Sequence, residues 1–341
     1  MSESEDRQDS NEELEVLIRP EDTVRPLRSF WLTVEIPVFL ALFSSALTDG
    51  VTLNLLLYRT CIVDLEYNAT KCSLLNILNK TGEAKDLETV VQSETTFLVM
   101  TLSVFSSIMP AILSVFLGSW SDKYGRKALI VWPLFGQLLT AVLTVVFSAI
   151  STLSAYYFVL CALPFAMLGG SSAILLGANL IVTDVTTEDN RSFRLALLQG
   201  SGFAGVLVGT VASSYVYDAV GYVPLFTFST TIYLLTFFYT IIFVRETVET
   251  AERGGLLRIF KCALLKDMGR ACFKKRSILV ASILTLLIAS YGITTVCIIG
   301  IGTVDYLFTR QKFQWLLKEY SIFSAVNTIV ALLGMFWQKF K

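Results

Sequence analysis

The chain has 341 residues, of which 54% are hydrophobic and only 16% are charged, with a net charge of −1 and no histidine. Soluble domains carry nearer to about 25% charged residues, so this composition excludes an ordinary water-soluble protein. The balanced charge excludes a nucleic-acid footprint, and the lack of histidine excludes imidazole metal ligands and catalytic Ser-His or Cys-His dyads. We therefore expect no enzyme activity, no metal and no cofactor.

The first thirty residues are polar and acidic, unlike the basic start of a cleaved signal peptide. We expect residues 1–30 to form a cytoplasmic acidic tail. The segment 13–18, Glu-Leu-Glu-Val-Leu-Ile, matches an acidic dileucine sorting signal. Such short patterns recur by chance, so both the plasma membrane and the endolysosomal membrane stay open as locations.

Eight apolar runs follow, each about 20 residues or longer. Lipid offers the backbone no hydrogen-bond partners, so runs of this length are expected to be transmembrane helices. The sequence thus predicts an all-α integral membrane protein with a first six-helix bundle in residues 31–244 and two more helices in residues 278–341. The predicted spans are 31–57, 97–120, 128–150, 155–182, 196–216, 222–244, 278–302 and 320–340.

Basic residues predict the orientation. With both termini in the cytoplasm, the inner segments hold 20 Lys and Arg and the outer ones 6, which is the bias expected of a membrane protein. Residues 59–93 then form a long outer loop and residues 245–277 a basic cytoplasmic linker. The outer loop contains two glycosylation sequons, at Asn68 and Asn79, and a cysteine pair, Cys61 and Cys72, which we expect to form a disulfide.

The inner loop between the second and third spans reads Gly118-Ser-Trp-Ser-Asp122-Lys-Tyr-Gly125-Arg126-Lys127. It resembles the signature motif of the major facilitator superfamily. The two glycines are expected to let a tight turn approach neighbouring helices. Asp122 is expected to pair with Arg126 and cap a helix N-terminus, while Arg126 and Lys127 anchor the loop at the lipid headgroups.

The segment 183–199 is similar to the junction of spans four and five in solute carrier family 46, which includes the proton-coupled folate transporter. Shorter similar stretches occur along residues 31–341. The resemblance implies a major facilitator fold of twelve helices, the last four without a counterpart here, and proton symport. It departs from the folate transporter at Gly169-Gly170, which lacks an acidic residue, and at Gln199, which replaces a glutamate.

Charged and polar side chains inside the spans are costly, so they are candidates for function. We expect Asp49, Asn54, Gln137, Gln199 and Asp305 to face a substrate or proton pathway. For Asp49 two interpretations stay open, a cation or proton site and an anchor at the outer interface. Asn54 is off the same face as Asp49, so a shared site would need unwinding near Gly50.

At the inner ends of spans four and five, Asp184, Arg191 and Arg194 are expected to form a gate or salt-bridge cluster. Glu35, near the inner end of the first span, is expected to act as an anchor at the membrane surface.

These features favour a secondary-active transporter of a small organic solute, such as an organic anion or a pteridine-like compound, driven by protons and working by alternating access. The alternative is a truncated, non-transporting membrane protein or a regulatory isoform. The expected partners are the solute, protons and the lipid bilayer. The sequence leaves the oligomeric state open.

Overall fold

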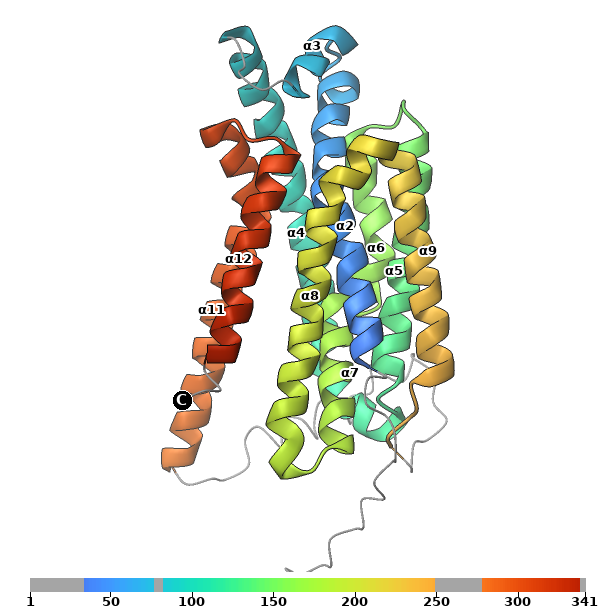
Figure 1. The fold of residues 1–341 in the computed structure, drawn as a ribbon, viewed down its shortest axis with the longest axis vertical. Coiled ribbons are helices and arrows are strands. Elements are labelled where there is room, and N and C mark those ends of the chain that lie inside the picture. The colour runs from blue at the N-terminus through green and yellow to red at the C-terminus, as the bar shows by residue number, and fades with distance from the viewer. Residues whose placement is uncertain (1–33, 77–81, 249–277, 338–341) are drawn as a thin grey trace, which may run out of the picture.

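A computed structural model describes residues 34–76, 82–248 and 278–337. The acidic tail and most of the basic linker lie outside these residues. All secondary structure within the described residues is helical. The helices run roughly parallel to the long axis of the molecule (Figure 1), as expected if lipid forces each apolar run to satisfy its own backbone hydrogen bonds.

Six helical segments in the described chain are long and apolar enough to cross a membrane. They match the first six predicted spans and are formed by seven helices: α2 Glu35–Arg59, α4 Gly82–Tyr124, α5 Ala128–Ala149, α6 Phe158–Met167, α7 Gly170–Val185, α8 Glu188–Val220 and α9 Tyr222–Phe243. Helices α11 (Ile278–Phe313) and α12 (Leu317–Trp337) lie at the seventh and eighth predicted spans but outside that set of six. That they cross the bilayer stays a prediction.

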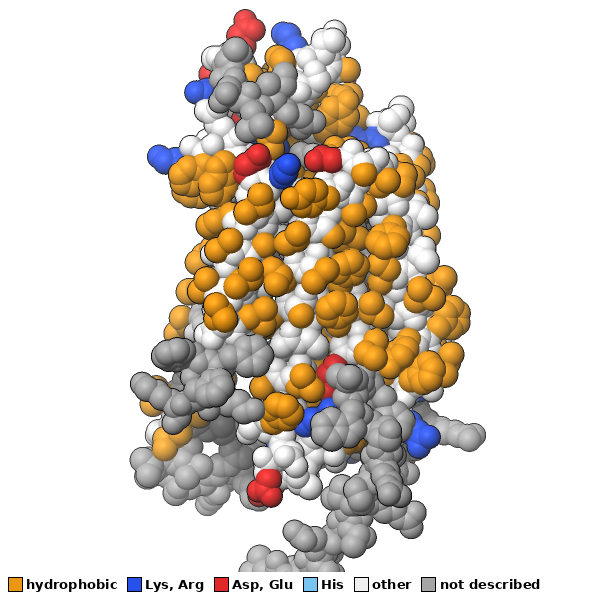
Figure 2. Space-filling model, viewed as in Figure 1, with side chains coloured by type: hydrophobic (Ala, Val, Ile, Leu, Met, Phe, Trp, Pro, Cys, Tyr) orange, Lys and Arg blue, Asp and Glu red, His pale blue; other side chains and the backbone are white. Residues whose placement is uncertain are grey.

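Hydrophobic side chains cover the middle of the face shown in Figure 2, and charged side chains lie toward its two ends. This band is the surface that lipid tails would contact. We call the end of the molecule that holds residues 59–76 the outer end and the opposite end the inner end, after the predicted topology.

The outer segment is more helical than a loop. Arg59 is followed by a π-helical turn (Thr60–Asp64), α3 (Ala69–Ser73) and a 3-10 turn (Leu74–Asn76). Helix α4 then begins at Gly82, well before the second apolar run at Phe97. Its 43 residues span roughly 65 Å at 1.5 Å per residue, about twice the hydrocarbon thickness. Hydropathy marks where a helix enters lipid, whereas its polar first turns continue into water.

The fourth predicted span is broken between α6 and α7. Gly169 (φ +103°) and Gly170 (φ +59°) adopt left-handed backbone conformations that end one helix and start the next. Pro164 lies inside α6, three residues before its end. The Phe165 N–H donates to Thr140 Oγ1 of α5 at 3.3 Å. Discontinuous helices of this kind border ligand sites in many transporters.

Small residues allow α8 to pack closely on α2. A Cβ atom added at Gly205 or Gly209 would collide with the carbonyl oxygen of Phe39 or Phe43. The glycine-rich segment 200–209 predicts close helix packing rather than ligand binding, and this is confirmed for Gly202, Gly205 and Gly209. Gly200 faces open space.

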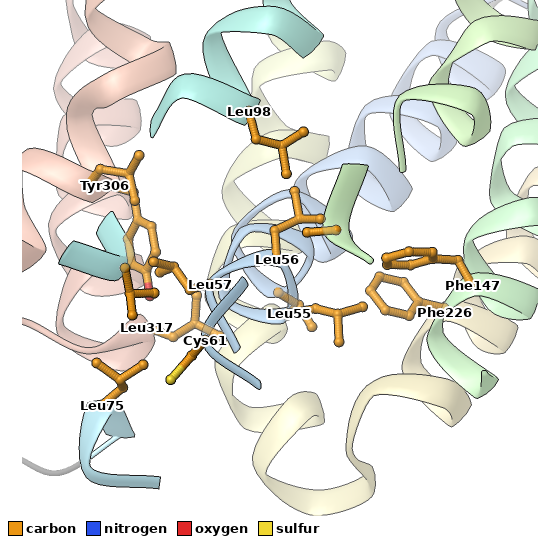
Figure 3. Packing of buried hydrophobic residues seen from close by; sticks show 14 of the residues in the cluster. Leu55, Leu56, Leu57, Cys61, Leu75, Leu98, Phe147, Phe226, Tyr306 and Leu317 are labelled. Carbon is orange, nitrogen blue, oxygen red and sulfur yellow. The ribbon is translucent and has the colours of Figure 1, made fainter. Parts of the chain in front are cut away.

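The two C-terminal helices join the bundle near its outer end. Tyr306 of α11 and Leu317 of α12 pack in the same hydrophobic cluster as Leu57, Cys61 and Leu75 (Figure 3). Toward the inner end, α11 is far more exposed, with Tyr291 at 77% and Val296 at 72%. The described contacts of α11 and α12 with the first bundle therefore gather at the outer end.

Candidate functional site

A cavity of about 520 Å³ lies among the helices of the first bundle. Helices α2, α4, α5 and α9 supply most of its wall, with Phe158 of α6 and Gly302 of α11 completing it. A volume of this size falls in the range of small-molecule sites. Its polar lining residues are Thr48, Asp49, Thr52, Ser103, Gln137, Thr140, Thr144, Ser229 and Tyr233.

Asp49 is the charged residue of this wall in the described part of the chain. It lies on α2, one turn after Ser45, whose hydroxyl is 3.3 Å from each of the two carboxylate oxygens. The carboxylate is exposed to the cavity although it lies in a predicted membrane span. The contact with the cavity favours a ligand or proton site over an interfacial anchor.

A second set of polar contacts fixes the wall between α5 and α9. Gln137 Nε2 donates to the Tyr233 hydroxyl at 3.0 Å, and that hydroxyl donates to the Ala41 carbonyl of α2 at 3.4 Å. Ser44 and Ser229 are linked hydroxyl to hydroxyl at 2.8 Å. These contacts tie α2, α5 and α9 together beside Asp49, so the polar groups are held by neighbouring helices.

Of the five residues predicted to face a pathway, Asp49 and Gln137 line the cavity, and Asn54, Gln199 and Asp305 do not. Helix α2 is continuous through Gly50, and five residues turn the chain by about 140°, so Asn54 points away from Asp49. Gln199 lies near the inner end of α8, next to the contact of Ser201 with the Glu35 carbonyl. Asp305 lies about one turn outward from Gly302.

At the outer end, a buried network surrounds Arg310 of α11, which is 1% exposed. Its guanidinium contacts Glu88 Oε1 of α4 at 2.8 Å and Asn54 Oδ1 of α2 at 3.3 Å. It also donates to the Leu75 carbonyl at 2.6 Å and the Tyr306 hydroxyl at 3.1 Å. Asn54 thus has a partner from the second pair of helices rather than from the cavity.

The outer segment itself is tied together by a disulfide between Cys61 and Cys72, the predicted pair. Leu75, whose carbonyl Arg310 contacts, follows this disulfide by three residues. Asn68 is exposed, and its side chain accepts a hydrogen bond from the Thr70 N–H at 3.4 Å. Asn79 lies outside the described residues. Glycosylation of both sites stays a prediction.

At the inner end, Glu246 holds the signature loop. Its carboxylate accepts hydrogen bonds from the backbone N–H groups of Arg126 (2.7 Å) and Lys127 (3.1 Å), at the start of α5. Gly125 has φ +107°, and a Cβ atom there would collide with Glu246. Burial lowers the pKa of the Lys127 ammonium, which Glu246 partly opposes. Lys127 also donates to the Ile241 carbonyl near the end of α9, at 2.6 Å.

Two expectations for the signature loop are corrected here. Asp122 pairs with Arg126 at 3.4 Å as predicted, but it is 63% exposed and Glu246, not Asp122, caps α5. The reason is that the chain after α9 brings a carboxylate directly over the N-terminus of α5. Gly118 has open space around it among the described residues, so only Gly125 serves a close approach.

The predicted cluster of Asp184, Arg191 and Arg194 is also rearranged. Asp184 pairs with Arg126 at 2.8 Å and accepts from the Thr247 hydroxyl at 2.8 Å. Arg194 pairs with Glu35 at 3.1 Å. Arg191 Nε is buried without a hydrogen-bond partner in the described chain. Glu35 is 2% exposed, so it is a buried ion-pair partner and not a surface anchor.

Several site residues were not predicted from the sequence. The hydroxyl residues and Tyr233 stand in apolar runs, where Ser, Thr and Tyr are common and cost little. Arg310 entered the sequence analysis only as a basic residue of an outer segment, and Glu88 was not singled out. The signal that could have found them is opposite charge at the outer ends of the second and seventh helices. Glu246 could have been found as an acidic residue directly after the sixth span.

Comparisons with known proteins give the family. The model of the Major Facilitator Superfamily matches residues 26–340. The chain is 26% identical over 301 residues to a probable peptidoglycan muropeptide transporter SLC46 of Drosophila melanogaster, covering 86% of this chain and 58% of that protein. It is 30% identical over 229 residues to the proton-coupled folate transporter of Rattus norvegicus, covering 66% and 48%.

A third relative is the lysosomal proton-coupled steroid conjugate and bile acid symporter SLC46A3 of Gallus gallus, 26% identical over 65% of this chain and 48% of that protein. The chain thus spans about half the length of these curated relatives. The crystal structure of the human organic anion transporter MFSD10 (TETRAN) superposes with a TM-score of 0.61, covering 90% of this chain and 72% of that one at 16% identity.

The predicted resemblance to solute carrier family 46 and the predicted major facilitator fold are confirmed by these matches. The relatives named are transporters, which confirms the prediction that the chain is not an enzyme. With a family model that covers residues 26–340, a helical bundle enclosing a polar cavity and the signature loop at its inner end, this chain belongs to the Major Facilitator Superfamily.

Proposed function

We propose that the protein moves a small organic solute across a membrane by alternating access, coupled to protons through Asp49. The observation that carries this proposal is the cavity of about 520 Å³ that exposes one carboxylate inside a bundle of membrane-length helices. Carriers need a binding site that opens to one side at a time, and they need no covalent chemistry.

The buried network at the outer end supports this mechanism. Arg310 joins α11 to α2 and α4 beside Asn54, which lies about 7.5 Å along α2 from Asp49 at 1.5 Å per residue. The inner ion pairs, Arg126–Asp184 and Arg194–Glu35, lie within the first bundle. In this proposal the network around Arg310 closes the outer end, and it would have to open for solute to enter from outside.

The relatives suggest which solutes to try. They are named as transporters of muropeptides, of folate, and of steroid conjugates and bile acids. Two of them are proton-coupled, which makes a proton gradient the expected driving force here. These 341 residues contain no histidine, so the proposed proton-binding group in them is a carboxylate.

The test is uptake into proteoliposomes that contain the purified protein, with radiolabelled folate, a muramyl dipeptide and taurocholate as probes. We expect accumulation of at least one probe when a pH gradient is imposed. Asp49→Asn should abolish this gradient-driven accumulation and leave exchange of the same probe measurable. Accumulation by the variant would shift the proton-binding role to Glu35 or Asp305.

The alternative is a non-transporting membrane protein or regulatory isoform. It is favoured by one observation: within the described residues, α11 contributes only Gly302 to the cavity wall. Proteoliposomes that take up none of the probes and show no exchange would support this alternative.

A further inference from the structure

Most hydroxyl groups on the cavity wall have already used their hydrogen atoms. Thr48 donates to the Ser45 carbonyl at 3.0 Å, Ser103 to the Val99 carbonyl at 2.9 Å, and Thr144 to the Thr140 carbonyl at 2.8 Å. A hydroxyl has a single hydrogen and two lone pairs. These three residues therefore offer the cavity acceptor oxygens and not donors.

The wall between α5 and α9 is mixed. Tyr233 donates its hydrogen to the Ala41 carbonyl, and one of the two N–H hydrogens of Gln137 Nε2 is donated to Tyr233, which leaves the other as a donor. Gln137 Oε1 is buried with no hydrogen-bond partner among the described residues, which costs free energy. Thr52 and Thr140 are the lining hydroxyls whose hydrogens no bond engages within the described chain.

The charge of the cavity wall also favours a solute group that donates hydrogen bonds. Asp49 is ionisable, and no Lys or Arg lines the cavity in the described part of the chain. A ligand carboxylate placed here would meet another carboxylate and a row of acceptor oxygens, with no cation to offset its desolvation. Protonation of Asp49 would not reverse this, because a carboxylic acid adds one donor but supplies no positive charge.

We propose that the solute presents a nitrogen group with N–H donors to the wall formed by α2, α5 and α9, such as an amidine, an amine or an amino-substituted heterocycle. This inference rests on the proposed transport function and names the chemistry of its solute. The N–H groups donate to the Asp49 carboxylate, which is exposed to the cavity, and any carboxylate of the solute lies away from this wall. Because the wall offers mainly hydrogen-bond acceptors, the solute enters the bundle with its nitrogen group facing this wall.

Three planar probes of nearly the same shape test the proposal. Benzamidine carries N–H donors and a positive charge, benzamide carries N–H donors and no charge, and benzoate carries neither donors nor a positive charge. Their binding to the purified full chain in detergent micelles would be measured by ligand-observed NMR, which detects weak complexes. We expect benzamidine to bind at least tenfold more tightly than benzoate, with benzamide in between.

Asp49→Asn should weaken benzamidine binding by about tenfold, as expected for loss of a hydrogen bond to a charged group. Asp218→Asn is the matched control, since this exposed carboxylate of α8 does not line the cavity and its loss should leave binding unchanged. The proposal is overturned if benzoate binds as tightly as benzamidine, or if benzamidine shows no saturable binding. If only the transport proposal is wrong, benzamidine will still bind more tightly than benzoate but no probe will be taken up into proteoliposomes. This outcome distinguishes the two proposals.

Discussion

A single carboxylate beyond the signature motif fixes the inner turn between α4 and α5. Glu246 accepts two backbone N–H groups where α5 begins, and these are groups that the helix itself cannot satisfy. Negative charge at a helix N-terminus also interacts favourably with the helix dipole. We expect Glu246→Ala to lower the free energy of unfolding by about 1–2 kcal/mol. Thermal unfolding of the purified protein in detergent micelles would measure the loss.

Asp122→Ala is the matched control for Glu246, because both carboxylates lie beside Arg126. Asp122 is 63% exposed and makes one long ion pair at 3.4 Å, so its removal should cost no more than about 0.5–1 kcal/mol. Equal losses for the two variants would show that the motif carboxylate holds the turn, as the sequence first indicated.

At the scale of helices, the contact between α2 and α8 depends on missing side chains. A Cβ atom at Gly209 would collide with the Phe43 carbonyl oxygen, and backbone cannot move aside cheaply. Gly209→Ala should therefore lower stability by about 1–3 kcal/mol. In the same helix, Gly200→Ala meets open space and should be neutral or stabilise by up to about 1 kcal/mol. Unfolding midpoints in detergent would compare the two, and a loss at Gly200 would contradict the packing described.

Sequence patterns identified the helices well but not their ends. Apolar runs of about 20 residues report which part of a helix meets lipid, so the first six spans were found. Hydropathy does not predict the polar helical turns that lie in water, and α4 begins at Gly82 rather than at Phe97. It is also silent about the break at Gly169, because an apolar run stays apolar whether or not its backbone is helical.

The candidate site was harder to predict for a physical reason. Asp49 was found because a carboxylate in an apolar run is costly and conspicuous. Asn54 is also polar and close in sequence, yet its direction on α2 sends it to Arg310. Pairings such as Arg310 with Glu88 join residues far apart along the chain, and hydropathy carries no information about which helices meet.

The Arg310 network connects three helices, α2, α4 and α11, at the outer end. Arg310→Ala removes contacts with Glu88, Asn54, Tyr306 and the Leu75 carbonyl. A cysteine is placed at Thr52, on the cavity wall, and an impermeant thiol reagent is applied from the outer side. We expect this cysteine to react at least tenfold faster in Arg310→Ala than in the protein that keeps Arg310. The background would carry serine at Cys161, Cys262, Cys272 and Cys297 and keep the disulfide.

Two further variants sharpen this experiment. Glu88→Gln keeps a hydrogen-bonding oxygen but removes the negative charge, so it should raise the reaction rate less than Arg310→Ala. Lys312→Ala removes an exposed basic side chain two residues away and should leave the rate unchanged. An unchanged rate in Arg310→Ala would show that the outer end is closed by apolar packing of the kind in Figure 3 and not by this network.

For the molecule as a whole, the described contacts between helices differ between the outer end and the inner end. At the outer end α11 and α12 are joined to the first bundle through Arg310, through Gln92 with the Leu307 carbonyl at 2.5 Å, and through Ser213 with Ser321 at 3.4 Å. At the inner end the described ion pairs stay within the first bundle. Such a division suits a carrier in which one end separates while the other holds.

The last prediction concerns how the whole molecule sits in the membrane. The 20-to-6 distribution of basic residues predicts that both termini lie in the cytoplasm and that Asn68 and Asn79 lie outside. In eukaryotic cells we expect glycosidase to increase gel mobility of the wild type, and this shift should vanish in an Asn68→Gln, Asn79→Gln double variant. Asn190 begins a third sequon, Asn190-Arg191-Ser192, but lies in the first turn of α8 at the inner end, so Asn190→Gln should change nothing. Labelling of an N-terminal tag on intact cells would show that the topology is the opposite of the predicted one. The sides from which solute and protons enter would then be exchanged as well.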